Sequence, residues 1–386
     1  MPVISADAFA SKDPKENIQH AKDIIIGATR SSRFAGLLGP TDTSIIKTQN
    51  ESYSKTSIIT MSFLAPLRTR GGRGNDNLDT TQGKLKRLFM DVKGNVISES
   101  ITSENVKKLS RSSWTTFRTD SKNSLTEWYK WTTDAERFAK LSFECTKVTC
   151  VKADGSVSED PKTLALNDVL GALALDEAYD RAKNGWTDAN NKRHPKMKPY
   201  KVEVGDVKGV KTDIEIFVLL VGGASAKHLA DDPLFIQKKI ALADVDRAKM
   251  PYAGGIGVYD DKIIVVDVGT WNEEDSGIVT SNTLDWIDIN NQTIGGFNLY
   301  GGGATNQIET EVNLLLGAGA GVQPFQAIPD YAEDGKTVDS GRKLRVFTDG
   351  FFGFEKFKPQ GETVAEKALP WHDEDYGVQA LVCTTK

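Results

Sequence analysis

The sequence predicts an α+β protein with helices and strands interleaved around a large core. Residues 214–221 and 263–268 have the continuous apolar character of buried strands, and the stretch between them carries start and stop signals for two helices. Strand patterns also gather in the C-terminal part, and two longer helical patterns precede the first buried strand. With 386 residues, 39% of them hydrophobic, the chain can bury a large core and form two or more domains.

The first 60 residues are predicted to form an arm rather than a domain. Asp13-Pro14-Lys15-Glu16 combines an N-cap, a proline at the first helical position and an acidic first turn, and so starts a helix. Residues 41–55 are polar and have too few apolar side chains to fold alone. We therefore expect residues 1–60 to be ordered by lying on another surface.

Residues 61–120 are rich in glycine and in strand-forming residues. The run from Arg68 to Gly74 contains three glycines and cannot be helical throughout. Residues 85–91, a turn at 92–95 and a returning strand at 96–101 predict a β-hairpin. Since this hairpin has few large apolar residues, we expect it to pack against a partner.

Two helices are predicted in the next part of the chain. Ser124 and Glu127 form a capping box, and apolar side chains follow at helical spacing, which predicts a helix at 124–141. A second helix is predicted at about 166–183, ending at Asn184-Gly185. Residues 186–211 are predicted to be a polar connection.

The α/β unit that begins at residue 214 follows. Gly222-Gly223 breaks the first strand, a short helix is expected around 226–230, and Asp232 with Pro233 starts a second helix. Met250-Pro251 is expected to close that helix before the strand at 263–268.

The C-terminal third is predicted to be mainly strand. Residues 309–316 form an apolar strand, and residues 317–321 form a turn of small residues. Strands are expected at 344–348 and 351–357, joined as a hairpin through Asp349-Gly350. A last strand at 376–384 would build the C-terminus into a sheet.

Charge is distributed unevenly along the chain, whose net charge is −5. Residues 66–120 carry 11 Lys and Arg against 6 Asp and Glu, whereas residues 121–386 carry 30 against 41. This split is compatible with a solvated basic hairpin on an acidic body. It is also compatible with copies that bind one another, the basic segment of one lying on the acidic body of the next.

Candidate chemistry fails at each site. The four histidines show no metal-ligand spacing, and the three cysteines (Cys145, Cys150, Cys383) are too scattered for a zinc site or a disulfide framework. The glycines at 317, 319 and 321 lack the spacing and the following helix of a dinucleotide site. Asp285 and Asp288 do not match an EF-hand loop. We predict no catalytic residue, cofactor or metal ligand, and hence no enzyme.

Several segments together resemble the major capsid proteins of tailed phages, in particular the podovirus group typified by coliphage N-four. They are "LSRSSWTTFRTD…LTEWYKWTTDAERFAKLS", "FVLLVGGASAKHLADDPLF…MPYAGGIGVYDDKIIVVD", "VNLLLGAGAGVQPF", "GRKLRVFTDGFFGFEKFKP" and "EDYGVQALVCTTK". Their order and spacing agree over roughly residues 60–386. The loop at 68–93 departs from the family in being more basic and richer in glycine.

The resemblance implies the Hong Kong ninety-seven type capsid fold, with an N-terminal arm, an extended loop, a peripheral domain with a spine helix, and an axial domain. Residues 1–60 would be the arm, 61–120 the extended loop, 121–211 with 332–386 the peripheral domain, and 212–331 the axial domain. The spine would be either the helix at 124–141 or the helix at 166–183. It also implies a virion shell subunit assembled in the host bacterial cytoplasm as pentamers and hexamers around double-stranded DNA, which is contacted only non-specifically.

Expected partners are the chain itself, a separate scaffolding protein, a portal and decoration or cement proteins. We expect no proteolytic maturation, and no membrane partner, because no apolar run reaches about 18 residues. We hypothesise that basic residues of the extended loop contact acidic surface on an adjacent subunit; they are Arg68, Arg70, Arg73, Lys84, Lys86 and Arg87. The alternatives are an encapsulin-type compartment, which shares the fold, and a soluble α/β enzyme.

Overall fold

The structure is a computed structural model. It describes residues 14–49, 58–64, 87–104, 111–142, 144–207, 210–240, 256–268, 293–294, 297–298, 300–301, 308–326, 330–334, 338, 342–361 and 364–385. The helices are α1 (Pro14–Ser31), η2 (Ala35–Leu37), α3 (Arg111–Ser142), η4 (Pro161–Thr163), α4 (Ala172–Asn184), α5 (Gly223–Asp231), α6 (Pro233–Ile240) and α7 (Val364–Lys367).

The strands make up two large sheets and three two-stranded pairs. In the first half they are β1 (Leu38–Gly39), β2 (Ile46–Thr48), β3 (Ile58–Leu64), β4 (Arg87–Lys93), β5 (Asn95–Thr102), β6 (Val148–Val151), β7 (Val157–Ser158), β8 (Trp186–Thr187), β9 (Arg193–His194) and β10 (Tyr200–Val207). In the second half they are β11 (Val210–Val221), β12 (Gly257–Tyr259), β13 (Ile263–Asp267), β14 (Thr293–Ile294), β15 (Phe297–Asn298), β16 (Tyr300–Gly301), β17 (Ile308–Leu316), β18 (Gly321–Gln326), β19 (Asp330–Asp334), β20 (Arg345–Lys356) and β21 (Val378–Thr384).

A nine-stranded sheet forms one part of the molecule. Its order is β12-β13-β11-β17-β21-β6-β7, with β10 added on β11 and β16 on β17. Phe217, Leu219 and Val221 of β11 pack in the core that α4, α5 and α6 cover. Val218 and Leu220 belong instead to a core shared with the C-terminal end of α3. Burial on both faces is why this strand has a continuous apolar sequence.

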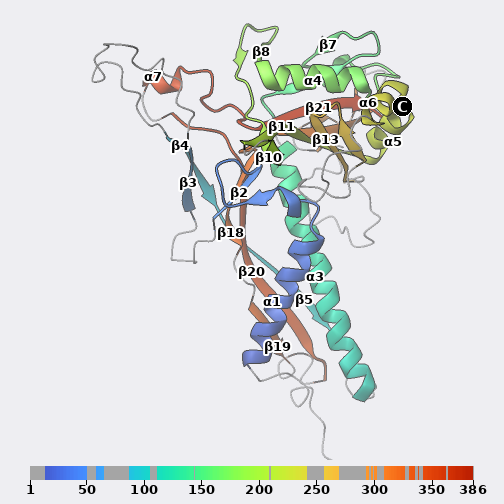
Figure 1. The fold of residues 1–386 in the computed structure, drawn as a ribbon. Helices are drawn as coiled ribbons and strands as arrows, with labels where there is room; N and C mark the ends of the chain where they lie inside the picture. The colour runs from blue at the N-terminus through green and yellow to red at the C-terminus, as the bar shows by residue number, and fades with distance from the viewer. Residues whose placement is uncertain are drawn as a thin grey trace, which may run out of the picture.

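An elongated part carries the second sheet, in the order β1-β2-β18-β20-β19 with β5 on β20. The helices α1 and α3 run along it, below the α4–α6 layer in Figure 1. Ile24 of α1, Leu125 and Tyr129 of α3, and Leu344 and Val346 beside and on β20 form its buried core.

The buried α/β unit of the sequence prediction is confirmed. Strands β11 and β13 are parallel neighbours, with Phe217 opposite Ile263, and α5 and α6 follow the Gly222-Gly223 break. Asp232 caps α6 by accepting from the Leu234 N–H at 2.8 Å. The predicted end of that helix at Met250-Pro251 lies outside the described residues.

The longest helix begins earlier than predicted. Helix α3 runs over 32 residues, about 48 Å, from Arg111, so Ser124 and Glu127 lie inside it. Both are exposed, and a capping box has the same spacing as two residues on the solvent face of a helix. Helix α4 starts at Ala172 instead of 166, while its predicted C-cap is confirmed: Gly185 has φ +69° and donates to Arg181 O.

Both predicted hairpins are wrong. Strand β20 continues through Asp349-Gly350, because β19 and β5 pair with it on its two sides and hold Asp349 in register with Asp330 and Ser98. Strand β4 does not pair with β5, which follows it after Gly94. It pairs with β3, and β5 crosses to β20.

Two other expectations need revision, and the domain division stays a prediction. Helix α1 buries Ala21, Ile24 and Ala28 against this chain's own α3, so the helical part of the predicted arm does have a core. The polar connection at 186–211 contains β8, β9 and β10. The predicted domain bounds at 120/121, 211/212 and 331/332 fall inside α3, β11 and β19.

The predicted final strand is confirmed as β21, paired with both β17 and β6.

Candidate functional site

A two-stranded ribbon, β3 with β4, stands at the side of the body (Figure 1). Its strands are antiparallel, with Ile58 opposite Lys93 and Leu64 opposite Arg87. Side chains alternate between two faces, as in any strand. The inner face buries Met61, Phe63 and Leu88. We call this element the ribbon.

The inner face holds the ribbon to the body through an apolar cluster. The Phe63 ring lies 4.4 Å from that of Phe357, between ring centroids, and Val322 completes the contact. Lys47 of β2 donates to Ser62 O at 2.5 Å and pairs with Asp42 at 2.6 Å. Burial alone would raise the pKa of Asp42, but the hydrogen bond and charge of Lys47 lower it. The base of the ribbon is therefore firmly fixed.

The outer face of the ribbon carries large apolar side chains that are partly exposed in the described part of the chain. Ile58, Leu64 and Phe89 are 53%, 37% and 38% exposed. Thr60 donates to Asp91 across the strands at 2.5 Å. A two-stranded ribbon with large apolar side chains in water is a surface suited to a protein contact.

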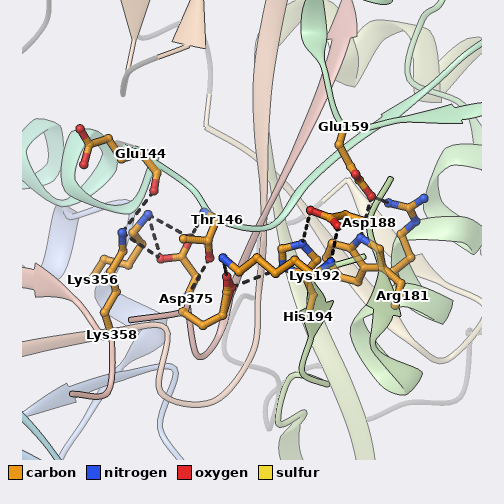
Figure 2. A network of polar contacts seen from close by, with 12 residues as sticks. Glu144, Thr146, Glu159, Arg181, Asp188, Lys192, His194, Lys356, Lys358 and Asp375 are labelled. Carbon is orange, nitrogen blue, oxygen red and sulfur yellow. Dashed lines mark hydrogen bonds and ion pairs between the residues drawn. The ribbon is translucent and has the colours of Figure 1, made fainter. Parts of the chain in front are cut away.

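A network of ionic contacts lies between β20, the loop before β21 and the segment that follows α3 (Figure 2). Lys356 of β20 lies 3.0 Å from Asp375, and Lys358 lies 3.9 Å from the same carboxylate. Asp375 also accepts from the Thr146 N–H at 2.7 Å. The C-terminal loop is thus joined to the segment that follows α3.

The second half of this ionic network is centred on Glu374. This carboxylate lies 2.5 Å from Lys192 and 3.3 Å from His194 Nδ1. His194 stacks on Trp186, with ring centroids 4.7 Å apart. Burial alone would raise the pKa of Glu374, but His194 and Lys192 lower it to about 2. Glu374 is therefore ionised at neutral pH.

Lys147 is a further cation beside this network. Its side chain is fully buried, and its Nζ has no hydrogen-bond partner. Burial lowers its pKa to about 8, although Asp375 and Glu374 act in the opposite direction. With Lys147 counted, this ionic network contains more cations than carboxylates.

A separate buried ion pair joins α1 to α3. Arg137 Nη1 lies 2.8 Å from Asp134 Oδ1, and Asp134 accepts from Ser32 Oγ at 2.5 Å and from the Arg33 N–H at 2.8 Å. Arg137 Nε donates to Gln323 of β18 at 3.0 Å. This pair connects the end of α1, helix α3 and the second sheet.

Of the predicted contact residues, only Arg87 lies in the described part of the chain. It is exposed at the start of β4, where it donates to Ser62 Oγ at 3.1 Å. Arg68, Arg70, Arg73, Lys84 and Lys86 lie outside the described residues. Sequence reasoning missed the network of Lys147, Glu374 and Asp375, because Lys147 lies more than 200 positions before the two carboxylates and the three follow no motif spacing.

The described residues hold no cluster of three or more His, Cys, Asp or Glu side chains able to bind a metal ion. All three cysteines are free, and burial raises the pKa of each to about 12, which suppresses thiolate chemistry. None of the helices in the described ranges has the length and apolar character needed to cross a bilayer. The candidate calcium ligands Asp285 and Asp288 are outside these ranges.

The chain is similar to several phage head structures. It matches the capsid of Helicobacter pylori bacteriophage KHP30, in its acidic stable form, with a TM-score of 0.68 and 21% identity over 92% of this chain and 90% of that one. The head of Helicobacter pylori bacteriophage KHP40 gives 0.65 and 20%, over 92% and 91%. The capsid of Ralstonia phage GP4 gives 0.63 and 17%, over 92% and 91%. No curated protein sequence matches this one.

The predicted Hong Kong ninety-seven type fold is confirmed by these similarities. A family model described as phage capsid protein matches residues 8–378, nearly the whole chain. This chain therefore belongs to the phage capsid protein family, as a major capsid protein that forms the shell of a phage head.

Proposed function

We propose that copies of this chain assemble in the host bacterial cytoplasm into pentamers and hexamers, and that these close into an icosahedral shell around double-stranded DNA. The observation that carries the proposal is the ribbon: its base is fixed by Phe63 and Phe357, while Ile58, Leu64 and Phe89 on its outer face are partly exposed. A fixed base directs the ribbon, and an uncovered apolar face favours contact with a neighbour. The role is structural rather than catalytic.

The domain roles expected from the family can be assigned along the observed sheets. We assign α1, α3, β5 and β18–β20 to the peripheral domain, with α3 as the spine. The nine-stranded sheet with α4, α5 and α6 is assigned to the axial domain, which then takes β6, β7, β10 and β21 from the segments first predicted as peripheral. The ribbon and residues 65–86 between its strands are assigned to the extended loop. Support comes from sheet membership, since strands of one sheet share a core.

Charge supports the proposed contact of the extended loop. Residues 66–120 are basic, residues 121–386 are acidic, and Arg87 is exposed at the ribbon. Opposite charge on the two partners guides copies into register and adds specificity more than affinity. The expected scaffolding protein, portal and decoration proteins stay predictions.

Charge reversal tests this proposal. In one variant Lys86 and Arg87 become Glu, and a matched control carries Lys162→Glu and Lys227→Glu, two exposed positions away from the ribbon. Electron microscopy should show shells for the control and few or none for the ribbon variant. Any shells of the ribbon variant should dissociate at lower salt. Equal assembly and equal salt stability of the two variants would contradict the proposed contact.

A further inference from the structure

An open groove of about 820 Å³ lies between α4, the segment that joins β9 to β10, β11 and the loop before β21. Its floor is apolar, since Met197 and Phe217 line it and are each 2% exposed. Trp371 and Tyr376 stand at its wall, and both are half-buried. A groove with an apolar floor and aromatic walls can hold large apolar side chains of a ligand.

The rim of this groove is strongly basic. Lys183, Arg193, Lys196 and Lys198 line it, against one carboxylate, that of Glu215. Glu215 is paired with Lys201 at 3.5 Å. Arg193 donates to a backbone carbonyl, that of Asn184, at 3.3 Å.

None of the four rim cations pairs with a carboxylate within the described part of the chain. Many other cations of the same subunit do, such as Lys122 with Asp23 and Lys140 with Glu355. Lys198 donates to Asp42 O at 3.1 Å and lies in the field of that carboxylate. In a chain of net charge −5, four cations around one apolar groove, with no ion pair of their own among the described residues, indicate an acidic partner.

One segment of this chain has that chemistry. Residues 269–292 contain five carboxylates and no Lys or Arg, and they include Trp271 and Trp286. They lie outside the described residues. Their carboxylates match the rim of the groove, and their indole rings match its floor and wall. A phosphodiester strand would satisfy the cations but would leave the floor at Met197 and Phe217 unfilled, so a peptide fits better than a nucleic acid.

The strand before residues 269–292, β13, ends away from the groove. Phe217 of β11 lines the groove and pairs in register with Ile263 of β13. From Ile263, β13 runs away from the groove to Asp267, which is in register with Val221. Strand β17, which follows the segment, enters from the same far side and reaches Leu316, level with Val218, only at its end. This direction favours a neighbouring copy over the same copy.

We propose that the groove binds the acidic segment 269–292 of a second copy of this chain. The inference deepens the proposed function, on which it rests, because neighbouring copies meet repeatedly only in an assembly. It adds a contact separate from the ribbon: carboxylates of the segment bind the rim, and an indole ring of the segment lies against the floor.

Photo-cross-linking in the full-length assembly tests this contact. Trp371 is replaced by p-benzoylphenylalanine in protein prepared from a mixture of isotope-labelled and unlabelled chains, and cross-linked peptides are identified by mass spectrometry. The expected product joins position 371 of one copy to residues 269–292 of another, with mixed labels. Cross-links within one copy only, to another segment, or to DNA would overturn the proposal.

Charge-swap variants provide a second test of this contact. Lys183→Glu with Lys196→Glu should lower the cross-linking yield about tenfold, and adding Glu273→Lys with Glu274→Lys should restore part of it. Lys227→Glu, exposed on α5, is the matched control and should change nothing. An equal yield from the groove variant and the control would overturn the proposal. Electron microscopy of the wild-type sample separately shows whether shells form, so a failure of the proposed function is distinguished from a failure of this contact.

Discussion

The guanidinium group of Arg137 lies 2.8 Å from the carboxylate of Asp134, one turn earlier on α3, and the two side chains are 2% and 3% exposed. Removing one partner of such a pair leaves the other as an uncompensated buried charge. Asp134 also binds the end of α1 through Ser32 and the Arg33 N–H. The pair should therefore be a main determinant of how α1 lies on α3.

Asp134→Ala is expected to lower the free energy of unfolding by about 3–5 kcal/mol, because Arg137 then stays buried without a counter-charge. Urea unfolding of dissociated subunits measures this. Glu127→Ala is the matched control on the same helix: its partner Lys130 is 3.3 Å away at the surface, and the loss should stay below about 1 kcal/mol. Similar losses for both variants would refute the role of the buried pair.

Lys147→Met is expected to stabilise the subunit at pH 7 by about 1–3 kcal/mol, because it removes a buried ammonium that has no hydrogen-bond partner. Asp375 and Glu374 keep their other cations, Lys356 and Lys192. The measurement is urea unfolding at pH 7, and a destabilised variant would contradict the prediction.

The pH dependence of the stability of wild type and Lys147→Met gives an independent check. Burial lowers the pKa of folded Lys147 to about 8 from 10.5. Between these values the folded state has released a proton that the unfolded state still holds, so wild-type stability should rise with pH through this window relative to Lys147→Met. A constant difference between the two proteins from pH 7 to pH 10 would contradict it.

Glu374→Gln is expected to cost about 1–3 kcal/mol at pH 7, because the pKa of Glu374 is lowered to about 2 from 4.5 in the folded state. Because the pKa of this carboxyl is lower in the folded state than in the unfolded state, its ionised form stabilises the folded state. The stabilisation is complete above pH 4.5 and disappears as the pH falls toward 2. Thermal unfolding of wild type and variant from pH 7 to pH 3 should show the difference shrinking only in the acidic part of that range.

Two phenylalanines of the ribbon separate folding from assembly. Phe63→Ala removes a ring that is 1% exposed and should cost the subunit about 3–5 kcal/mol. Phe89→Ala removes a ring that is 38% exposed on the outer face and should cost the subunit less than about 1 kcal/mol, while lowering the temperature at which assembled shells dissociate. The idea fails if Phe89→Ala shells dissociate at the wild-type temperature.

Sequence patterns predicted those elements whose environment is uniform along their length. The second half of β11, residues 216–221, is apolar because both of its faces are buried, and α6 carries its own start signal in Asp232 and Pro233. The C-terminal strand β21, which is buried at every position, was predicted for the same reason.

Elements defined by distant partners could not be predicted in this way. Asp349-Gly350 has the sequence of a turn but lies in the middle of β20, since strands from residues 95–102 and 330–334 pair there. The hairpin predicted from 85–101 failed because β4 and β5 choose different partners across Gly94. The network of Lys147, Glu374 and Asp375 depends on the same long-range pairing, which local patterns do not encode.

The central claim is that the ribbon joins neighbouring copies in a closed shell. Electron cryomicroscopy of the purified, assembled protein tests it most directly. The account predicts icosahedral shells of pentamers and hexamers in which a neighbouring subunit covers Ile58, Leu64 and Phe89 of the ribbon. Small discrete oligomers, or shells in which these three side chains stay exposed to solvent, would contradict it.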